Sequence, residues 1–330
     1  MLSGRLGHAT EYWKTEGPGF AARVAAFKLI EPLYPVLPPL AWKTLMMWAR
    51  LGYWPNIRNP RTFNEKMAHR QLFAPHPLAP LVADKWRVRQ YVAKRGLADI
   101  LNEVYLTTDD PAKIPFDDLP DRFVIKANHG CGMNIIVPDK SRLDRPAVIS
   151  RCREWLATKY GRASRNNETH YDAIPPLLVV ERFIEDGEHD VPVDYKFYCF
   201  HGTVHMVQVD QSRSSVHHSN LYDRAWRDTG IRGLVPRSTV ATPEPPRLAE
   251  MVRIAERLGD GLDFCRVDLF APDPRTILFG EITLHPAGGL VVYSPKKADF
   301  ELGKLWVTRR PGADNLAAPP PGGGRMRSLA

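Results

Sequence analysis

Short runs of alternating apolar and polar residues recur from residue 122 onward, and turn-forming residues separate them. Alternation of this kind predicts half-buried β-strands. The dipeptide His201-Gly202 joins two of these runs, which predicts a hairpin. The expected strands are residues 122–127, 135–137, 177–183, 193–200, 203–210 and two runs within residues 263–289.

Helical patterns precede these strands and lie between them. Residues 1–60 are predicted to be helical with proline interruptions, and Thr62 or Asn64 is a plausible N-cap for the helix that follows. Asp144 is expected to cap a second helix, whereas residues 211–242 are expected to be mostly loop. Because antiparallel hairpins dominate, the predicted class is α+β rather than a doubly wound parallel sheet. Further helices are predicted at residues 84–95, 144–160 and 245–258.

The last predicted hairpin places two carboxylates opposite each other. If its turn is centred on residues 274–275, Asp268 lies opposite Glu281 and Arg266 lies opposite Thr283. Side chains alternate across a strand, so these four share one face. The other face is apolar and suits a core: Val267, Leu269, Leu278 and Ile282.

Two interpretations of this hairpin follow from charge. Carboxylates directly across a strand pair repel each other. A hard divalent cation between Asp268 and Glu281 would remove that repulsion. Alternatively, Arg266 neutralises both acids on a solvated sheet face.

A glycine-bearing turn, Asn128 to Asn134, joins two other predicted strands. Glycines let backbone N–H groups approach an anion closely, although an ordinary hairpin turn has the same composition. Neither a P-loop nor a dinucleotide-binding fingerprint is present. Lys126 stands in an otherwise apolar strand just before the turn, which favours a bound anion over a side chain that bends out to solvent.

Two further polar residues interrupt apolar strands. Glu181 ends the run Leu177 to Val180, where a strand edge can pair with an adenine edge or simply belong to a core. Lys196 shares its face with Tyr198 and Phe200. A buried ammonium there requires an anionic partner, whereas a solvent-exposed one does not.

Composition and charge narrow the class of protein only slightly. The 330 residues are 44% hydrophobic with a formal net charge of +8, which favours anionic partners such as nucleotides, acidic glycans or a membrane surface. The four cysteines form no CxxC pair, so a thiolate zinc site is not indicated, and they fit a reducing cytosol. We expect no signal peptide and no membrane-spanning helix.

The N-terminal aromatic residues allow two interpretations. Trp42, Trp48, Tyr53 and Trp54 lie near Lys43 and Arg50, a composition that can contact a membrane interface. A helix packed on the main domain explains them equally and is the interpretation we favour.

Six segments in order carry a resemblance to a known family: NPRTFNEKM, ADKWRVRQYV, FVIKANHGCGMNII, VDYKFYCFHG, RVDLF and FGEITLHPAGG. Their order resembles the ATP-grasp superfamily and, more closely, the TupA-like ATP-grasp family of polysaccharide-biosynthesis proteins. The resemblance covers residues 59–306.

The resemblance implies an ATP-grasp fold, in which two α+β subdomains with antiparallel sheets clasp ATP. We expect an accessory helical region at residues 1–83 and the ATP-grasp domain at residues 84–310, with its lid at residues 121–185. Residues 311–330 are of low complexity and are expected to be a disordered tail.

The resemblance also implies roles for individual residues. Lys85, Lys126 and Lys196 would contact phosphate, and Glu188 or Asp190 would lie near the ribose. The residues implied to fold over the phosphates are Gly130, Cys131, Gly132 and Met133. Those implied to line the adenine edge are Glu181, Arg182, Phe183 and Ile184.

Magnesium would bind to Asp268, Glu281 and Thr283. Many ATP-grasp enzymes have Asn where this chain has Thr283, and a hydroxyl is a poorer ligand. Arg266 and Lys196 are the candidate catalytic residues. Arg266, Arg213 and Arg232 are candidates to bind a substrate carboxylate, because a guanidinium pairs with it bidentately.

The resulting hypothesis is a carboxylate–amine ligase that uses ATP and Mg²⁺ to modify a cell-surface polysaccharide or its precursor. Its partners would be a small-molecule or glycan carboxylate and an amine, without nucleic acid. We expect a cytoplasmic location, with peripheral contact at the inner membrane face as an option. The alternatives are a glycosyltransferase-like enzyme of the same kind of pathway and a non-catalytic ATP-binding module.

Overall fold

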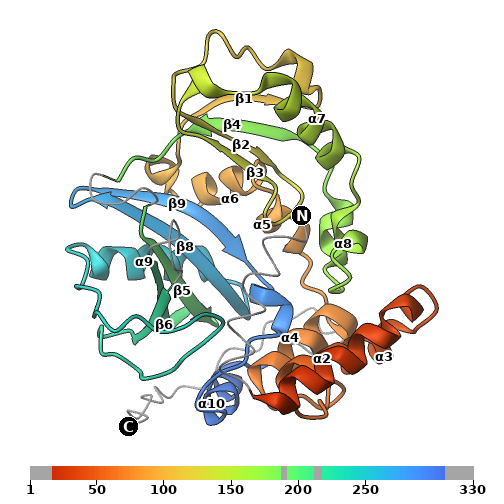
Figure 1. Cartoon of the computed structure of the whole chain (residues 1–330). Coiled ribbons are helices and arrows are strands. Elements are labelled where there is room, and N and C mark those ends of the chain that lie inside the picture. Colours follow the sequence, from red (N-terminus) through yellow and green to blue (C-terminus); the bar gives the residue numbers. More distant parts are fainter. Residues whose placement is uncertain (1–16, 187–191, 212–217, 309–330) are drawn as a thin grey trace.

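The computed structural model describes residues 17–186, 192–211 and 218–308. It confirms the α+β class, with two antiparallel sheets, one above the other (Figure 1). The small sheet has the order β1 (Val104–Thr108), β4 (Leu178–Arg182), β2 (Phe123–Ala127) and β3 (Asn134–Val137). The large sheet has the order β7 (His218–Asp223), β6 (Thr203–Gln211), β5 (Asp194–Phe200), β8 (Phe264–Asp273) and β9 (Thr276–Thr283).

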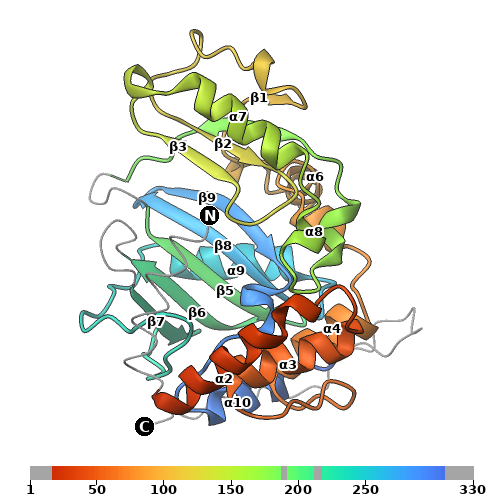
Figure 2. The ribbon, with the colours of Figure 1, turned by 45° about the vertical axis from the view of Figure 1, so that its right-hand side comes forward.

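Helices surround the two sheets (Figures 1 and 2). Three confirm predicted helices with somewhat different bounds: α6 (Val88–Lys94), α7 (Arg145–Leu156) and α9 (Leu248–Gly259). The other α-helices of the described residues are α2 (Pro18–Ile30), α3 (Pro39–Leu51), α4 (Phe63–Phe73), α5 (Ala79–Ala83), α8 (Tyr160–Ala163) and α10 (Lys297–Leu305). Short 3₁₀ turns include η1 (Glu31–Leu33), η5 (Thr169–Ala173) and η6 (Pro286–Gly289).

Side-chain caps fix two helix starts at predicted positions. Asp144 accepts a hydrogen bond from Ala147 N at 3.0 Å and begins α7. Thr62, rather than Asn64, begins α4 through a reciprocal capping box with Glu65. Asn64 instead donates its side-chain amide to Val291 O at 2.9 Å, which fastens α4 to the segment beyond η6.

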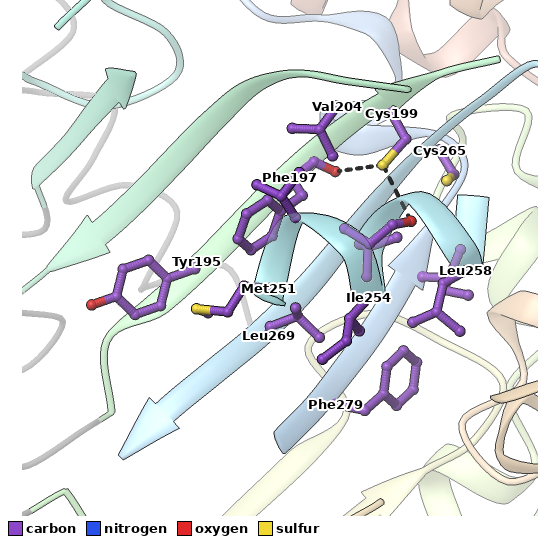
Figure 3. Packing of buried hydrophobic residues seen from close by; sticks show 14 of the residues in the cluster. Tyr195, Phe197, Cys199, Val204, Met251, Ile254, Leu258, Cys265, Leu269 and Phe279 are labelled. Atoms are coloured by element: carbon purple, nitrogen blue, oxygen red, sulfur yellow. Dashed lines mark hydrogen bonds between the residues drawn. The ribbon is translucent and has the colours of Figure 1, made fainter. Parts of the chain in front are cut away.

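The main core lies between the large sheet and α9 (Figure 3). Tyr195, Phe197 and Cys199 alternate along β5 and all face this helix, as strand geometry requires. The Cys199 thiol contacts Ala255 O at 3.5 Å. The opposite face of β5 is therefore free to carry Lys196 toward the small sheet.

A second core belongs to the small sheet. Cys152 and Trp155 of α7 pack on Phe123 and Leu178. Strand β1 belongs to this sheet but lies before residue 121. We therefore propose that the lid subdomain begins near Val104 instead of residue 121.

The structure differs from the sequence prediction in two places: an additional strand forms, and a different residue of β9 faces the core. Residues 218–223 form β7 within the predicted loop, because Ser219 and Asn220 are polar yet buried and hide the alternation. In β9, a bulge at Gly280 shifts the register, so Leu269 pairs with Phe279. As a result, Phe279 and not Leu278 lies on the face of β9 that packs in the main core, and the predicted face of the buried Leu278 is wrong.

The N-terminal helices pack on the rest of the chain. Trp42 is 2% exposed, and its indole donates to Arg165 O at 2.7 Å. Lys43 is fully buried and donates to Gly288 O at 2.7 Å. Among the described residues, no helix combines the length and hydropathy needed to cross a bilayer.

The buried ion pair of Arg70 and Asp263 should dominate the stability of the lower half of the protein. Asp263 accepts from Arg70 at 3.0 Å and from the Trp306 indole at 2.9 Å. Asp263→Asn leaves the Arg70 charge buried without its partner, so we expect a loss of about 3–5 kcal/mol in the free energy of unfolding, measured by urea denaturation. The exposed Asp118→Asn is the matched control, and equal unfolding midpoints for the two variants would contradict the prediction.

The same pair gives a pH dependence. Burial acts to raise the pKa of Asp263, but Arg70 and the Trp306 indole hold it below its ordinary value. A carboxyl with a depressed pKa in the folded state stabilises the protein above the unfolded pKa. The stability difference between wild type and Asp263→Asn should therefore be full at neutral pH and shrink as pH falls through the depressed pKa.

Candidate active site

The predicted carboxylate pair lies on the face of the large sheet that is turned toward the small sheet. Asp268 is directly opposite Glu281, and Arg266 is opposite Thr283, as the sequence predicts. Arg266 donates to both oxygens of Asp268, at 2.7 and 2.6 Å, and to Glu281 Oε1 at 3.0 Å. Thr283 Oγ1 donates to Glu281 Oε1 at 2.9 Å. The guanidinium thus offsets the repulsion between the two acids.

The two carboxylates differ in their exposure to solvent. Asp268 has a 3% exposed side chain and Glu281 a 44% exposed one. Burial raises the pKa of Asp268 to about 6 against the effect of Arg266. For Glu281, the opposing effects of burial and of Arg266 leave the pKa at about 2. Glu281 is therefore an ionised carboxylate that remains accessible to a ligand.

Lys196 lies beside this pair and is 6% exposed. It forms ion pairs with Asp194 and, at 3.4 Å each, with Asp210 and Asp268. Burial acts to lower the pKa of Lys196, but the three carboxylates raise it overall. Of the two environments that the sequence allowed for Lys196, the structure shows the buried one, in which the ammonium has anionic partners.

A second set of charges comes from the lid and from the segment before α6. Lys126, on β2, forms an ion pair with Glu181 on the neighbouring strand β4. Lys85, just before α6, donates to the carbonyl of Gly130 in the glycine turn of the lid. Burial lowers the pKa of Lys85, and Glu281 on the large sheet opposes this shift. Lys85 thus contacts the glycine turn while it lies within electrostatic range of Glu281.

The glycine turn is confirmed between β2 and β3, with one change in its predicted surface. Gly132 has a φ of 70°, which favours glycine, and Cys131 is exposed. Met133 is 6% exposed and packs in the lid core. Its side chain therefore points away from any phosphate, and only its backbone belongs to the turn.

A cavity of about 600 Å³ opens beside the end of β4. Arg182, Phe183 and Ile184 line it, together with Leu278 of β9. The Arg122 guanidinium lies 4.3 Å from the centre of the Phe183 ring. Three of the four residues predicted for the adenine edge thus line this cavity, whereas Glu181 pairs with Lys126.

Some predicted residues cannot be placed in this arrangement. Glu188, Asp190 and Arg213 lie outside the described residues. Arg232 forms a backbone bridge with Ser294, with N–O distances of 2.8 and 2.9 Å. Its role stays a prediction.

The acids around Lys196 were missed in the sequence. An ideal hairpin around His201-Gly202 would pair Asp194 with Val209. A bulge between Tyr198 and Cys199 shifts the register, so Asp194 pairs with Asp210 instead. Only the alternation of Asp194 with Lys196 along one strand could have indicated part of this cluster.

The donor set suits magnesium better than a transition metal. Within the described residues, no group of three or more His, Cys, Asp or Glu side chains is arranged to hold a metal. Magnesium commonly uses one or two carboxylates and completes its shell with phosphates and water. Asp268 and Glu281 fit that requirement, since each carboxylate has lone pairs beyond those that accept from Arg266.

A family model provides the remaining observation. The model described as TupA-like ATPgrasp matches residues 65–307 of the sequence. The chain belongs to the TupA-like ATP-grasp family. Its two facing antiparallel sheets form the ATP-grasp fold. Among curated proteins, none matches the chain.

Solved structures similar to this TupA-like protein include three ligases. They are the ATP-grasp ligase PsnB complexed with minimal precursor (12% identity, TM-score 0.35), D-alanine–D-alanine ligase from Bacillus anthracis complexed with ATP (14%, 0.35) and L-amino acid ligase from Bacillus licheniformis (14%, 0.40). The matches cover 63%, 62% and 68% of this chain and 54%, 54% and 46% of the others. The chain thus spans about half the length of these proteins, and the similarity concerns the fold alone.

Lys126 gives a test of nucleotide binding in this TupA-like protein. Lys126→Met removes a cation and leaves Glu181 unpaired, so the site becomes more negative toward phosphate. We expect the Kd for ATP, measured by calorimetry, to rise about tenfold or more. The control variant is Lys113→Met. Lys113 is exposed and does not line the cavity, so this change should leave the Kd for ATP unchanged. Equal ATP affinities for the two variants would show that Lys126 does not contribute to ATP binding.

Proposed function

We propose that the protein is an ATP-dependent carboxylate–amine ligase. A substrate carboxylate attacks the γ-phosphoryl group of ATP and gives an acyl phosphate and ADP. An amine then displaces phosphate and forms an amide. The single observation that carries this proposal is the Asp268–Glu281 pair on one face of the large sheet, with Arg266 and Lys196 in contact with it.

The chain's own residues have separable roles in this reaction. Asp268 and Glu281 would hold magnesium, which neutralises phosphate charge when bound. Arg266 and Lys196 orient the two carboxylates and lower their mutual repulsion. Lys126 of the lid and Lys85 before α6 would bring positive charge to the phosphates. Phosphoryl transfer needs mainly positioning and charge neutralisation, which these groups supply.

The cavity at the end of β4 is the proposed adenine site. Phe183, Ile184 and Leu278 supply apolar walls, and the backbone after β4 supplies hydrogen-bonding groups. Lys85 and Lys126 would then lie on the phosphate side of the nucleotide.

The biological substrate is proposed from family membership. We infer that the carboxylate belongs to a cell-surface polysaccharide or its precursor, and that the protein acts in the cytoplasm. A small-molecule acid of the hexuronate class is the simplest candidate. The cations near Glu281, among them Arg266 and Lys85, agree with an anionic substrate.

The catalytic proposal is tested by removing the charge of either acid. Asp268→Asn and Glu281→Gln should each lower ATP turnover by at least about a hundredfold, since each would weaken the binding of the magnesium ion that neutralises the phosphates. The assay contains Mg-ATP, a hexuronic-acid panel and an amino-acid panel, with ADP and products read by mass. Asp118→Asn, an exposed aspartate that does not line the cavity, is the matched control.

Three outcomes separate the possible functions. ADP release that requires both an acid and an amine supports the ligase. Transfer from a nucleotide sugar without ATP indicates a glycosyltransferase-like enzyme. ATP binding without turnover, unaffected by Asp268→Asn and Glu281→Gln, indicates a non-catalytic module.

A further inference from the structure

The outer side of α2 is an exposed apolar surface. Four exposed residues of this helix stand at spacings i, i+3, i+4 and i+7 and therefore share one side: Ala22, Ala25, Ala26 and Leu29. Leu29 is 83% exposed. The apolar surface continues along the chain past η1, where Leu33 is 49% and Val36 77% exposed. Single exposed aliphatic residues are ordinary, but a continuous set of them marks an interaction surface.

The inner side of α2 is fixed against α3, so this surface belongs to a packed part of the protein. Phe20 is 4% exposed, and the Arg50 guanidinium lies 5.4 Å from the centre of its ring. The rings of Phe27 and Tyr34 lie with their centres 4.9 and 4.8 Å from that of Trp42. Both helices lie at the lower end of the molecule, away from the small sheet (Figures 1 and 2). The apolar residues on the outer side of α2 are therefore held in one orientation.

The charge around this surface is almost entirely positive. Residues 17–64 contain six lysines and arginines but a single acid, Glu31. Glu31 is paired with Arg165 of the lid at 2.9 Å, which neutralises it. Lys28, beside Leu29, is the one exposed charged residue within residues 18–39, and Arg58 and Arg61 are exposed further along the chain. A partner that covers this surface therefore meets cations next to aliphatic side chains.

This combination fits a lipid surface better than another protein. The centres of protein–protein interfaces are enriched in aromatic residues, methionine and arginine, whereas the exposed side chains here are alanine, leucine, valine and proline. A helix with an apolar side and neighbouring basic residues buries that side at the boundary between lipid headgroups and acyl chains. With 13 residues, α2 is too short to span a bilayer, so it would lie along the surface.

We propose that the outer side of α2, together with Leu33 and Val36, docks on a bilayer surface that carries anionic lipids. The aliphatic side chains enter the boundary between headgroups and acyl chains, and the cations of residues 17–64 attract the lipid phosphates. Trp42, an aromatic residue whose sequence context allowed membrane contact, is buried and has no part in this surface. The inference does not depend on the proposed ligase function.

The test is co-sedimentation of the full-length protein with vesicles. One preparation contains equal parts of phosphatidylcholine and phosphatidylglycerol, and the other contains phosphatidylcholine alone. We expect wild type to bind the anionic vesicles at least about tenfold more tightly than the neutral ones, and added salt to weaken this binding. Leu29→Glu, and separately Val36→Glu, should raise the Kd for anionic vesicles about tenfold or more, because a carboxylate on this face opposes burial in lipid.

The matched control places the same charge at another exposed aliphatic residue. Val240 is 70% exposed and lies in a different part of the chain, so Val240→Glu should bind vesicles like wild type. Lys28→Gln should raise the Kd for anionic vesicles about fivefold and leave that for neutral vesicles unchanged, since one cation near the surface is lost. Thermal unfolding and the Kd for ATP, which should both match wild type, check that each variant is folded.

Several results would overturn the inference. Wild type that does not bind anionic vesicles contradicts it, as do equal Kd values for Leu29→Glu and Val240→Glu. A wild-type dimer that Leu29→Glu dissociates, without vesicle binding, would show that a second copy covers the surface. Vesicle binding only after removal of residues 1–16 would show that this segment covers it in the full chain. Vesicle binding by a protein without ATP turnover would overturn the proposed function and leave this inference standing.

Discussion

The ion-pair arrangement of Arg266 with Asp268 and Glu281 is the constraint on which the candidate site depends. Two carboxylates on adjacent strands repel each other, and burial of Asp268 increases the cost of its charge. Arg266 offsets both effects from the same sheet face, through three hydrogen bonds to the two acids. The site is therefore pre-assembled, and its accessible acid, Glu281, is the one that remains ionised.

Lys196 extends this arrangement into a network of alternating charge. Asp194, Asp210 and Asp268 surround one buried ammonium, so any change at one acid alters the balance at the others. Buried networks of this kind are costly when incomplete and specify one geometry when complete. The network thus ties strands β5, β6 and β8 to the geometry of the proposed phosphate site.

The N-terminal helices participate in the same architecture although the family model begins at residue 65. Lys43 of α3 is fully buried. It donates hydrogen bonds to Asn166 at the lower end of the lid and to Gly288 in the turn after β9. Trp42 donates to Arg165 in the same lid segment. These contacts fasten the lower end of the lid to the turn after β9. The accessory region is therefore part of the frame that holds the lid beside the large sheet.

The sequence by itself determined the local features whose cause is local. Alternation and turn residues predicted the β8–β9 hairpin, the His201-Gly202 hairpin and the glycine turn, because period and turn chemistry are properties of neighbouring residues. The pairing of Asp268 with Glu281 followed from the same reasoning.

Tertiary structure alone decided what depends on distant contacts. The bulge at Gly280 placed Leu278 on the face of β9 opposite to the predicted one, and the bulge near Tyr198 brought Asp210 to Asp194. The burial of Ser219 and Asn220 made β7 a strand, and the contact of His170 with His285 joins residues 115 positions apart. Such contacts depend on packing between elements, for which the local pattern carries no signal.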